Sequence, residues 1–229
     1  MDMENMHPVY RFALPAATDK PLSEFNHHLA GVIVLLVGIS ALLMYASPRK
    51  FGFLKYVWPL GLLSLGIYLV IYSDPSDWPT SYVSLADTLK DTETLQHKIY
   101  ALLLITMGSI ELARAGGLAK RDIWKYSFPA LAAFGAIFLI FHRHEMPIHS
   151  MPAMPGMSGM GPEHSMHSPS QMASHTLVMY QHIGYVIVGL GIVATKILYD
   201  MRKLEGKYAP YLWPALTMLL GIALMLYRE

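Results

Sequence analysis

The chain contains no cysteine and few charged residues, and both shortages narrow the range of functions. Without cysteine it can form no disulfide framework, no thiolate metal site and no CxxC redox motif. Charged residues make up 14% of the 229 residues, compared with about a quarter in a soluble protein. The net charge of +1 argues against nucleic acid as a partner. No nucleophile–base pattern or phosphate-binding loop is evident either, so we do not expect an enzyme.

Hydrophobic residues make up 54% of the chain, and they form runs that are long enough to cross a bilayer, which takes about 20 residues. We therefore predict an all-α integral membrane protein with six transmembrane helices, and the lipid bilayer as its first partner. The six runs are roughly 27–47, 54–72, 97–115, 126–142, 176–199 and 210–227.

The basic residues follow the first, third and fifth runs, whereas acidic residues collect in the other connections. By the positive-inside rule, both termini then lie outside the cytoplasm. For a bacterial protein this orientation predicts a multi-pass inner-membrane protein, with the tail 1–25 and the connection 143–175 in the periplasm. The basic residues are Arg49, Lys50, Lys55, Arg114, Lys120, Arg121, Lys125, Arg202, Lys203 and Lys207.

One local pattern occurs three times in the membrane region 26–229. A span opens with Asn or Gln followed by His, and the next span carries an aromatic residue before Pro. The distance from His to Pro is 32 residues each time, for His27 and Pro59, His97 and Pro129, and His182 and Pro214. We interpret 26–72, 96–142 and 181–227 as three copies of one helical hairpin, with the prolines in first helical turns and their aromatic neighbours at the membrane interface.

The repeat places His27, His97 and His182 near the outer ends of three helices. If the hairpins surround a threefold axis, the three imidazoles can converge on a metal or a haem, because imidazole suits copper, zinc and iron. His175 and Met179 are spaced to share a helix face with His182. The alternatives are that these histidines face lipid headgroups or cap a neighbouring helix, and that Met179 is ordinary packing.

The connection 143–175 contains seven Met and five His residues but only three charged ones. Its stretch "MPAMPGMSGM" has Met at every third position and Pro or Gly between, which favours a polyproline II conformation over helix or strand. Thioethers are soft ligands that select Cu(I), so we predict a copper-binding loop; a low-complexity linker is the alternative. Ten positions are proposed as candidate copper ligands. They are His142, which directly precedes the loop, and His144, His149, Met151, Met154, Met157, Met160, His164, Met166 and His167.

Two charged residues lie deeper in the predicted spans. Glu111 follows His97 by 14 residues, and Lys196 follows His182 by 14 residues. Equal offsets place the two at one depth, so we expect a structural ion pair between the third and fifth spans, which would offset the cost of burying each charge. A coupling or proton-relay role is the alternative.

The outward histidines and the Met/His-rich region 142–182 resemble those of bacterial copper-resistance and copper-uptake membrane proteins of the CopD/PcoD type. The resemblance implies copper binding in copper homeostasis, transport or delivery, with a periplasmic copper chaperone as a possible partner. Two other functions remain open. One is a haem-b electron-transfer subunit resembling cytochrome b561, with two of His27, His97, His142 and His182 as axial ligands. The other is a non-catalytic accessory subunit of a larger membrane redox or copper-enzyme complex.

Overall fold

The structure is a computed structural model that describes residues 19–141 and 169–228, and this part of the chain contains helices and turns but no strand. The all-α prediction is thereby confirmed for the described residues. The helices are α1 (Asp19–Ala46), α2 (Pro48–Phe51), α3 (Leu54–Tyr72), α4 (Leu85–Thr88), α5 (Thr92–Ala115), the 3₁₀ turn η2 (Asp122–Tyr126), α6 (Ser127–Phe138), the 3₁₀ turn η3 (Leu139–Phe141), α7 (Pro169–Asp200) and α8 (Ala209–Met225).

Local signals start and end these helices. The Asp91 carboxylate accepts a hydrogen bond from the backbone N–H of Thr94 at 2.7 Å, which satisfies one of the N–H groups left unpaired at the start of α5. The same helix ends before Gly116 and Gly117, and Gly117 has φ = +75°, a left-handed conformation that glycine adopts without a steric penalty. The chain can therefore turn back sharply after α5.

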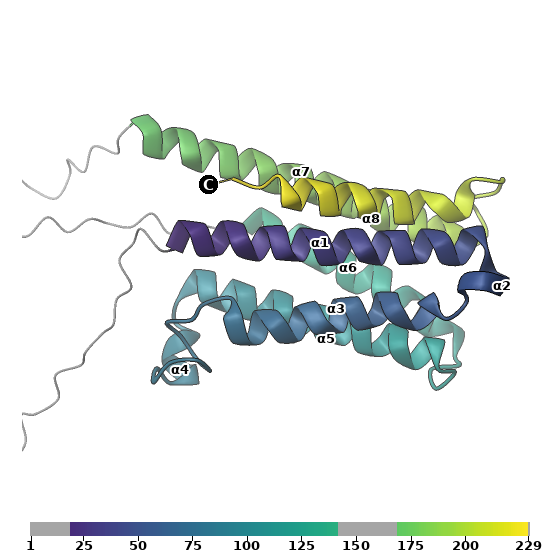
Figure 1. Cartoon of the computed structure of the whole chain (residues 1–229), viewed down its shortest axis with the longest axis horizontal. Coiled ribbons are helices and arrows are strands. Elements are labelled where there is room, and N and C mark those ends of the chain that lie inside the picture. Colours follow the sequence, from purple (N-terminus) through teal and green to yellow (C-terminus); the bar gives the residue numbers. More distant parts are fainter. Residues whose placement is uncertain (1–18, 142–168, 229) are drawn as a thin grey trace, which may run out of the picture.

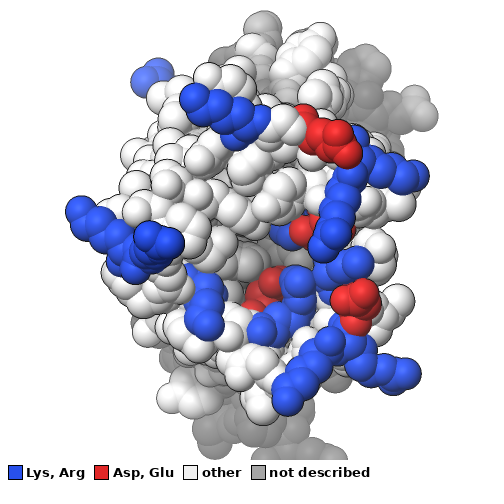
Figure 2. Space-filling view, turned by 90° about the vertical axis from the view of Figure 1, so that its right-hand side faces the viewer, with Lys and Arg blue, Asp and Glu red and all other residues white. Residues whose placement is uncertain are grey.

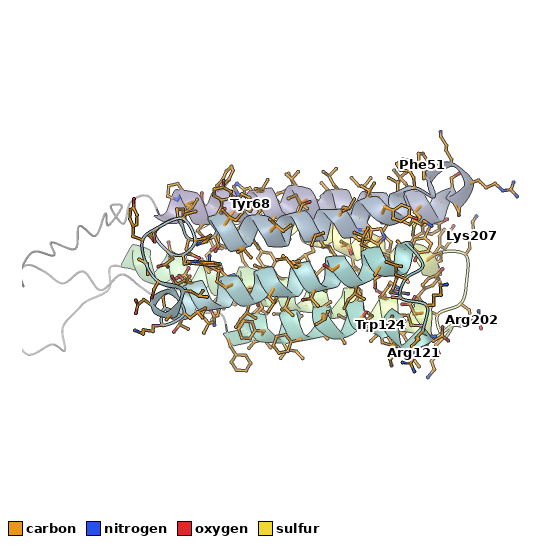
Figure 3. The ribbon with its side chains drawn as sticks, turned by 90° about the horizontal axis from the view of Figure 1, so that it is seen from below. Phe51, Tyr68, Arg121, Trp124, Arg202 and Lys207 are labelled. Atoms are coloured by element: carbon orange, nitrogen blue, oxygen red, sulfur yellow. The ribbon has the colours of Figure 1, made fainter. Side chains whose placement is uncertain are left out.

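The long helices lie side by side along the longest axis of the molecule (Figure 1). Helices α1, α5 and α7 run in one direction, and α3, α6 and α8 run in the other. Figure 3 places Phe51, Arg121, Trp124, Arg202 and Lys207 at the end of the bundle that holds α2, which we call the basic end. The opposite end, at which α1 and α5 begin and α8 finishes, is called the histidine end because it holds His27, His97 and His182.

Within the described residues, four helical segments are long and apolar enough to cross a membrane, namely Pro21–Ala46, Leu54–Tyr72, Asp122–Phe141 and Thr176–Asp200. Helix α8 is also apolar but shorter, with 17 residues. Helix α5 is long but carries ionisable residues, among them Lys98, Glu111 and Arg114, and it is not among the four. The apolar helices are consistent with a multi-pass membrane protein.

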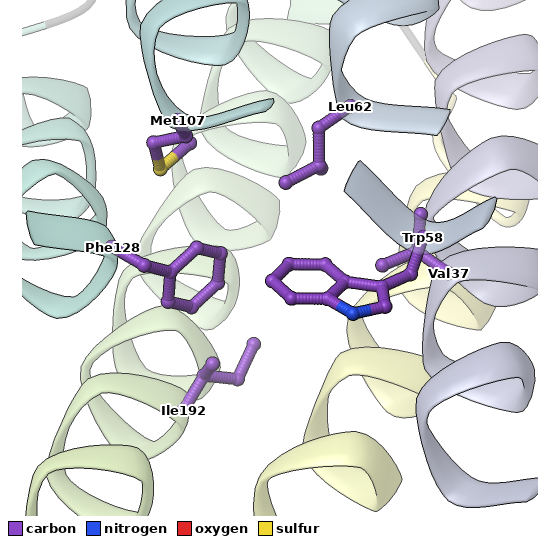
Figure 4. Close-up of a cluster of buried hydrophobic side chains, with 6 residues drawn as sticks. All are labelled: Val37, Trp58, Leu62, Met107, Phe128 and Ile192. Carbon is purple, nitrogen blue, oxygen red and sulfur yellow. The ribbon is translucent and has the colours of Figure 1, made fainter. Parts of the chain in front are cut away.

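Several core residues lie at equal distances from His27, His97 and His182 along the sequence. Trp58, Phe128 and Trp213, each directly before the shared Pro, contact one another with ring centroids 5.7–6.2 Å apart. They are buried against one another, so they do not face the lipid headgroups as an interfacial aromatic belt would. The side chains packed around Trp58 and Phe128 in Figure 4 include Val37, Met107 and Ile192, each ten residues after a repeat His.

Glycines allow two helix pairs to approach until their backbones touch. A Cβ at Gly221 of α8 would lie 2.5 Å from the backbone N of Leu35 in α1, and a Cβ at Gly108 of α5 would lie 2.7 Å from the backbone N of Leu63 in α3. Helix α6 packs less closely on α7, where a Cβ at Gly189 would meet Ala136 at 3.3 Å. Helix α1 thus packs directly against α8, and this contact completes a ring of helices.

Two of the repeat prolines lie deeper in their helices than expected. Pro59 and Pro214 each lie inside a helix, five residues after its first residue, and only Pro129 falls in a first turn. All three prolines are fully buried. The carbonyl groups of Pro59 and Pro214 lie against Gly108 and Gly38 respectively, so these helix pairs touch close to the prolines.

Candidate functional site

The residue before each repeat histidine holds the end of a helix in place. The side-chain amide of Asn26 donates to the Ser73 carbonyl at 3.4 Å, that of Gln96 to the Phe141 carbonyl, and that of Gln181 to the Arg228 carbonyl, the last two at 2.8 Å. Each acceptor lies just beyond or at the end of the second helix of the same sequence copy. These amides occupy carbonyl groups that a helix end leaves unpaired, which explains why Asn or Gln recurs there.

His27 and His182 come together at the histidine end. Their ring centroids are 6.2 Å apart, on helices α1 and α7. The Nδ1 of His27 donates to the Ser23 carbonyl at 2.8 Å, so its Nε2 carries the lone pair in the neutral ring. His182 is buried, with 7% of its surface exposed. The two imidazoles are close enough to share a ligand.

Tyr227, which follows α8, completes this cluster. Its ring stacks on His27 with centroids 3.8 Å apart and lies 6.1 Å from His182. Its carbonyl accepts a hydrogen bond from Nε2 of His28 at 3.0 Å. Tyr227 therefore contacts the histidines of both α1 and α7.

His97 lies in a different environment. Its Nδ1 donates to the Asp74 carboxylate at 3.2 Å, and the neighbouring Lys98 donates to the Val70 carbonyl and the Ser73 hydroxyl. Burial alone would raise the pKa of the Asp74 carboxyl, but the hydrogen bond and charge of His97, together with Ser73 and Lys98, lower it below its ordinary value. His97 thus pairs with a carboxylate.

The structure brings together two of the three repeat histidines. Among residues 19–141 and 169–228, no group of three or more His, Asp or Glu side chains is placed to hold a metal ion. Met179 lies on α7 with an exposed side chain, and position 175 lies one turn before it. The other predicted ligands lie outside the described residues, namely His142, His144, His149, Met151, Met154, Met157, Met160, His164, Met166 and His167.

Comparison with protein-family models, with curated proteins and with solved structures gives no match. The function of this arrangement has therefore to be inferred from the residues themselves.

The two deeper charges have partners other than those expected from the sequence. Glu111 binds Arg114 through both carboxylate oxygens at 2.6 and 2.7 Å, and Lys196 binds Asp200 one turn further along α7. The expectation of a direct pair between Glu111 and Lys196 is replaced by two pairs, each within one helix. Residues three or four positions apart lie on the same face of a helix, so each of these ion pairs forms within its own helix. Neither pair depends on how the neighbouring helix is rotated about its axis.

Asp74 and Tyr227 were missed by the sequence reasoning, although a signal for each exists. Tyr72, His142 and Tyr227 each follow a repeat histidine by 45 residues, so Tyr227 occupies a position shared by the three copies. Asp74 stands two residues beyond the first of these positions. The shared spacing in the sequence therefore reaches Tyr72 and Tyr227, close to the residues that contact His97 and His27.

Replacing Asp74 by Asn is expected to lower the free energy of unfolding by about 1.5–3 kcal/mol at neutral pH, because His97 loses a charged acceptor. A carboxyl with a lowered folded-state pKa stabilises the protein above its unfolded pKa, and this contribution disappears as the pH falls through the folded pKa. The difference from wild type should thus begin to shrink below about pH 4 and should vanish only below the lowered folded-state pKa of Asp74. Thermal unfolding in detergent at a series of pH values measures it.

Asp87→Asn is the matched control, since that carboxylate is exposed and pairs only with nearby Ser84 and Lys90. It should change stability little at any pH. Equal melting temperatures for wild type and Asp74→Asn at neutral pH would contradict the assigned contact.

Proposed function

We propose that this chain is a copper-binding inner-membrane protein of six spanning helices, built as three repeated hairpins. The loop 143–175 captures copper through thioethers and imidazoles, and a fixed site at His27 and His182 receives it. Copper homeostasis, transport or delivery is the corresponding role. A periplasmic copper chaperone or a larger membrane complex would be the protein partner.

The threefold repeat is supported by the recurrence of contacts at matching positions. The aromatic residues before the shared prolines meet in the core, and the amides before the shared histidines each bond the end of a partner helix. Helices α1 and α5 also contact α8 and α3 through glycines eleven residues after their histidines, Gly38 and Gly108. If the three hairpins are copies of one unit, the aromatic contacts, the amide hydrogen bonds and the glycine contacts are expected to recur at equal distances from the histidines.

The orientation is supported by the distribution of charge. Figure 2 views the basic end and shows Lys and Arg side chains around it, with few acidic ones. By the positive-inside rule this end faces the cytoplasm, so both termini and the loop 143–175 lie on the periplasmic side. The histidine end then also faces the periplasm, because it is the opposite end of the same bundle (Figure 1).

The contact between His27 and His182 is the observation that carries the copper proposal. Two imidazoles that bind one ion linearly, through bonds of about 2 Å, have ring centres about 6 Å apart, and the separation here is 6.2 Å. Helix η3 ends and α7 begins on either side of residues 142–168, so this Met/His-rich sequence joins the helix that carries His182. Thioethers hold Cu(I) exchangeably, whereas imidazoles on rigid helices hold it in a defined geometry.

Cu(I) stoichiometry of the purified full chain tests this proposal. We expect deletion of 146–167 to remove most of the bound copper, and His27→Ala with His182→Ala to remove a smaller, tightly held fraction. Acidification below about pH 6 should release the imidazole-bound fraction first, because imidazole binds metal only when neutral and thioethers do not titrate.

His97→Ala is the matched control for the histidine variants, because His97 pairs with Asp74 and takes no part in the contact between His27 and His182. It should leave the copper content unchanged. Unchanged copper in the loop deletion would overturn the capture role, and unchanged copper in the double variant would overturn the fixed site. A Soret band in the purified protein would favour the haem alternative instead.

A further inference from the structure

Lys and Arg side chains gather at the basic end of the bundle, and the copper proposal does not use them (Figure 2). Among the described residues, Arg114 and Lys125 at this end form ion pairs, with Glu111 and Asp122. Other basic side chains here are exposed and form no ion pair within that part of the chain, so their charge is available to an anion from outside. These are Arg49, Lys50, Lys55, Lys120, Arg121, Arg202, Lys203 and Lys207.

The connection 116–126, between α5 and α6, also exposes large apolar side chains. Leu118 is 84% exposed, Ile123 65% and Trp124 40%. Backbone hydrogen bonds hold this conformation, because the N–H of Leu118 donates to the Ala113 carbonyl at 2.8 Å and that of Trp124 to the Arg121 carbonyl at 3.0 Å. A connection in water would gain by burying such side chains, so their exposure points to an apolar neighbour outside the chain.

Lys120 and Arg121 stand between these apolar residues in the sequence, and both are exposed. Figure 3 labels Arg121 and Trp124 at the basic end. A segment that combines exposed apolar and basic side chains is typical of the headgroup region of a bilayer. Its apolar side chains reach the boundary of the acyl layer, and its cations meet the lipid phosphates.

Lysines at the basic end lie over the aromatic ring of the residue that follows them. An ammonium and a ring in such contact lie at similar depths, which suits the membrane interface, where rings meet the acyl boundary and cations meet the phosphates. All three connections at this end contribute such a pair. The pairs are Lys50 and Phe51 at 5.1 Å, Lys55 and Tyr56 at 4.8 Å, Lys125 and Tyr126 at 5.2 Å, and Lys207 and Tyr208 at 5.7 Å.

The connection between α3 and α5, at the histidine end, has the opposite charge. Its residues 73–91 include one lysine, Lys90, which already pairs with Asp87 at 2.6 Å. Its acidic residues are Asp74, Asp77, Asp87 and Asp91. An anionic ligand is therefore favoured at the basic end only.

We propose that the basic end binds the headgroups of anionic phospholipids, with the connection 116–126 as the main contact. Lys120 and Arg121 bind the lipid phosphate, while Leu118, Ile123 and Trp124 enter the outer part of the acyl layer. A zwitterionic headgroup binds less well, because it carries its own cation beside the phosphate. The proposal does not depend on copper, since none of these residues lies at the histidine end.

Native mass spectrometry of the purified full chain in detergent tests this proposal, with phosphatidylglycerol or phosphatidylcholine of identical acyl chains added. We expect the wild-type protein to bind phosphatidylglycerol at least about fivefold more tightly than phosphatidylcholine. Lys120→Gln with Arg121→Gln should lower the affinity for phosphatidylglycerol about fivefold or more and leave that for phosphatidylcholine unchanged.

Lys120→Arg with Arg121→Lys is the matched control, because it keeps both charges at the same two positions, and it should keep the preference for phosphatidylglycerol. Lys90→Gln removes an exposed lysine at the other end and should also keep it. Equal affinities of the wild-type protein for the two lipids would overturn the proposal and would favour an acidic protein as the partner of this surface. Wild-type affinity for phosphatidylglycerol in the glutamine variant would overturn it as well.

Discussion

Leucine in place of Gly221 is expected to lower the free energy of unfolding by at least about 3 kcal/mol, because it separates α8 from α1. A Cβ there would lie 2.5 Å from the Leu35 N and 2.8 Å from the Gly31 carbonyl oxygen. These neighbours are backbone atoms that cannot rotate away, so the helices themselves must move, which makes overpacking most costly. Thermal unfolding of the purified protein in a mild detergent measures the change.

Gly184→Leu is the control for this substitution. Gly184 lies in α7, and a Cβ there would meet nothing within 4 Å. Both variants add the same side chain to a helix, so only the close approach differs between them. If Gly221→Leu melts at the same temperature as Gly184→Leu, the contact between α1 and α8 is not as close as described.

Replacing Lys196 by Met is the second large effect that we expect, with a loss of about 3–5 kcal/mol in the free energy of unfolding. The substitution leaves the Asp200 carboxylate, which Lys196 neutralises, without its partner in a largely buried position. It also removes the cation from the face of Trp213. Chemical or thermal unfolding in detergent measures this loss.

Two further variants show whether the loss of stability in Lys196→Met comes from the unpaired buried charge or only from replacing a lysine. Lys125→Met breaks a pair whose Asp122 is almost fully exposed, so it should change stability by less than about 1 kcal/mol. Lys196→Met combined with Asp200→Leu should recover much of the loss, because no uncompensated charge remains. If Lys196→Met is as stable as Lys125→Met, the pair of Lys196 and Asp200 is not buried from water.

The positions of the helices were predictable because apolar runs of suitable length report them directly. All six predicted runs coincide with helical segments, including the short fourth run, which the structure completes with 3₁₀ turns at Asp122–Tyr126 and Leu139–Phe141. The equal spacings that suggest a repeat were visible for a similar reason, since equal spacings along the chain give equal distances along a helix. Neither inference needed any knowledge of which helices are neighbours.

The partners of individual side chains were much harder to predict. Trp58, Phe128 and Trp213 were expected at the lipid interface, where aromatic residues are common, but the three helices that carry them turn them toward one another. Glu111 and Lys196 were expected to form a pair, and instead each uses a residue of its own helix. Depth along a helix follows from the sequence, whereas rotation about its axis depends on packing.

The sequence by itself determined that this chain is helical and apolar, with histidines recurring at one end and basic residues at the other. Only the tertiary structure decided that His27 meets His182 and Tyr227 while His97 meets Asp74. The physical reason is that the ring of helices closes through glycines between α1 and α8, which brings the first and last long helices together. Contacts between residues about 200 positions apart depend on that closure, and no local pattern reports it.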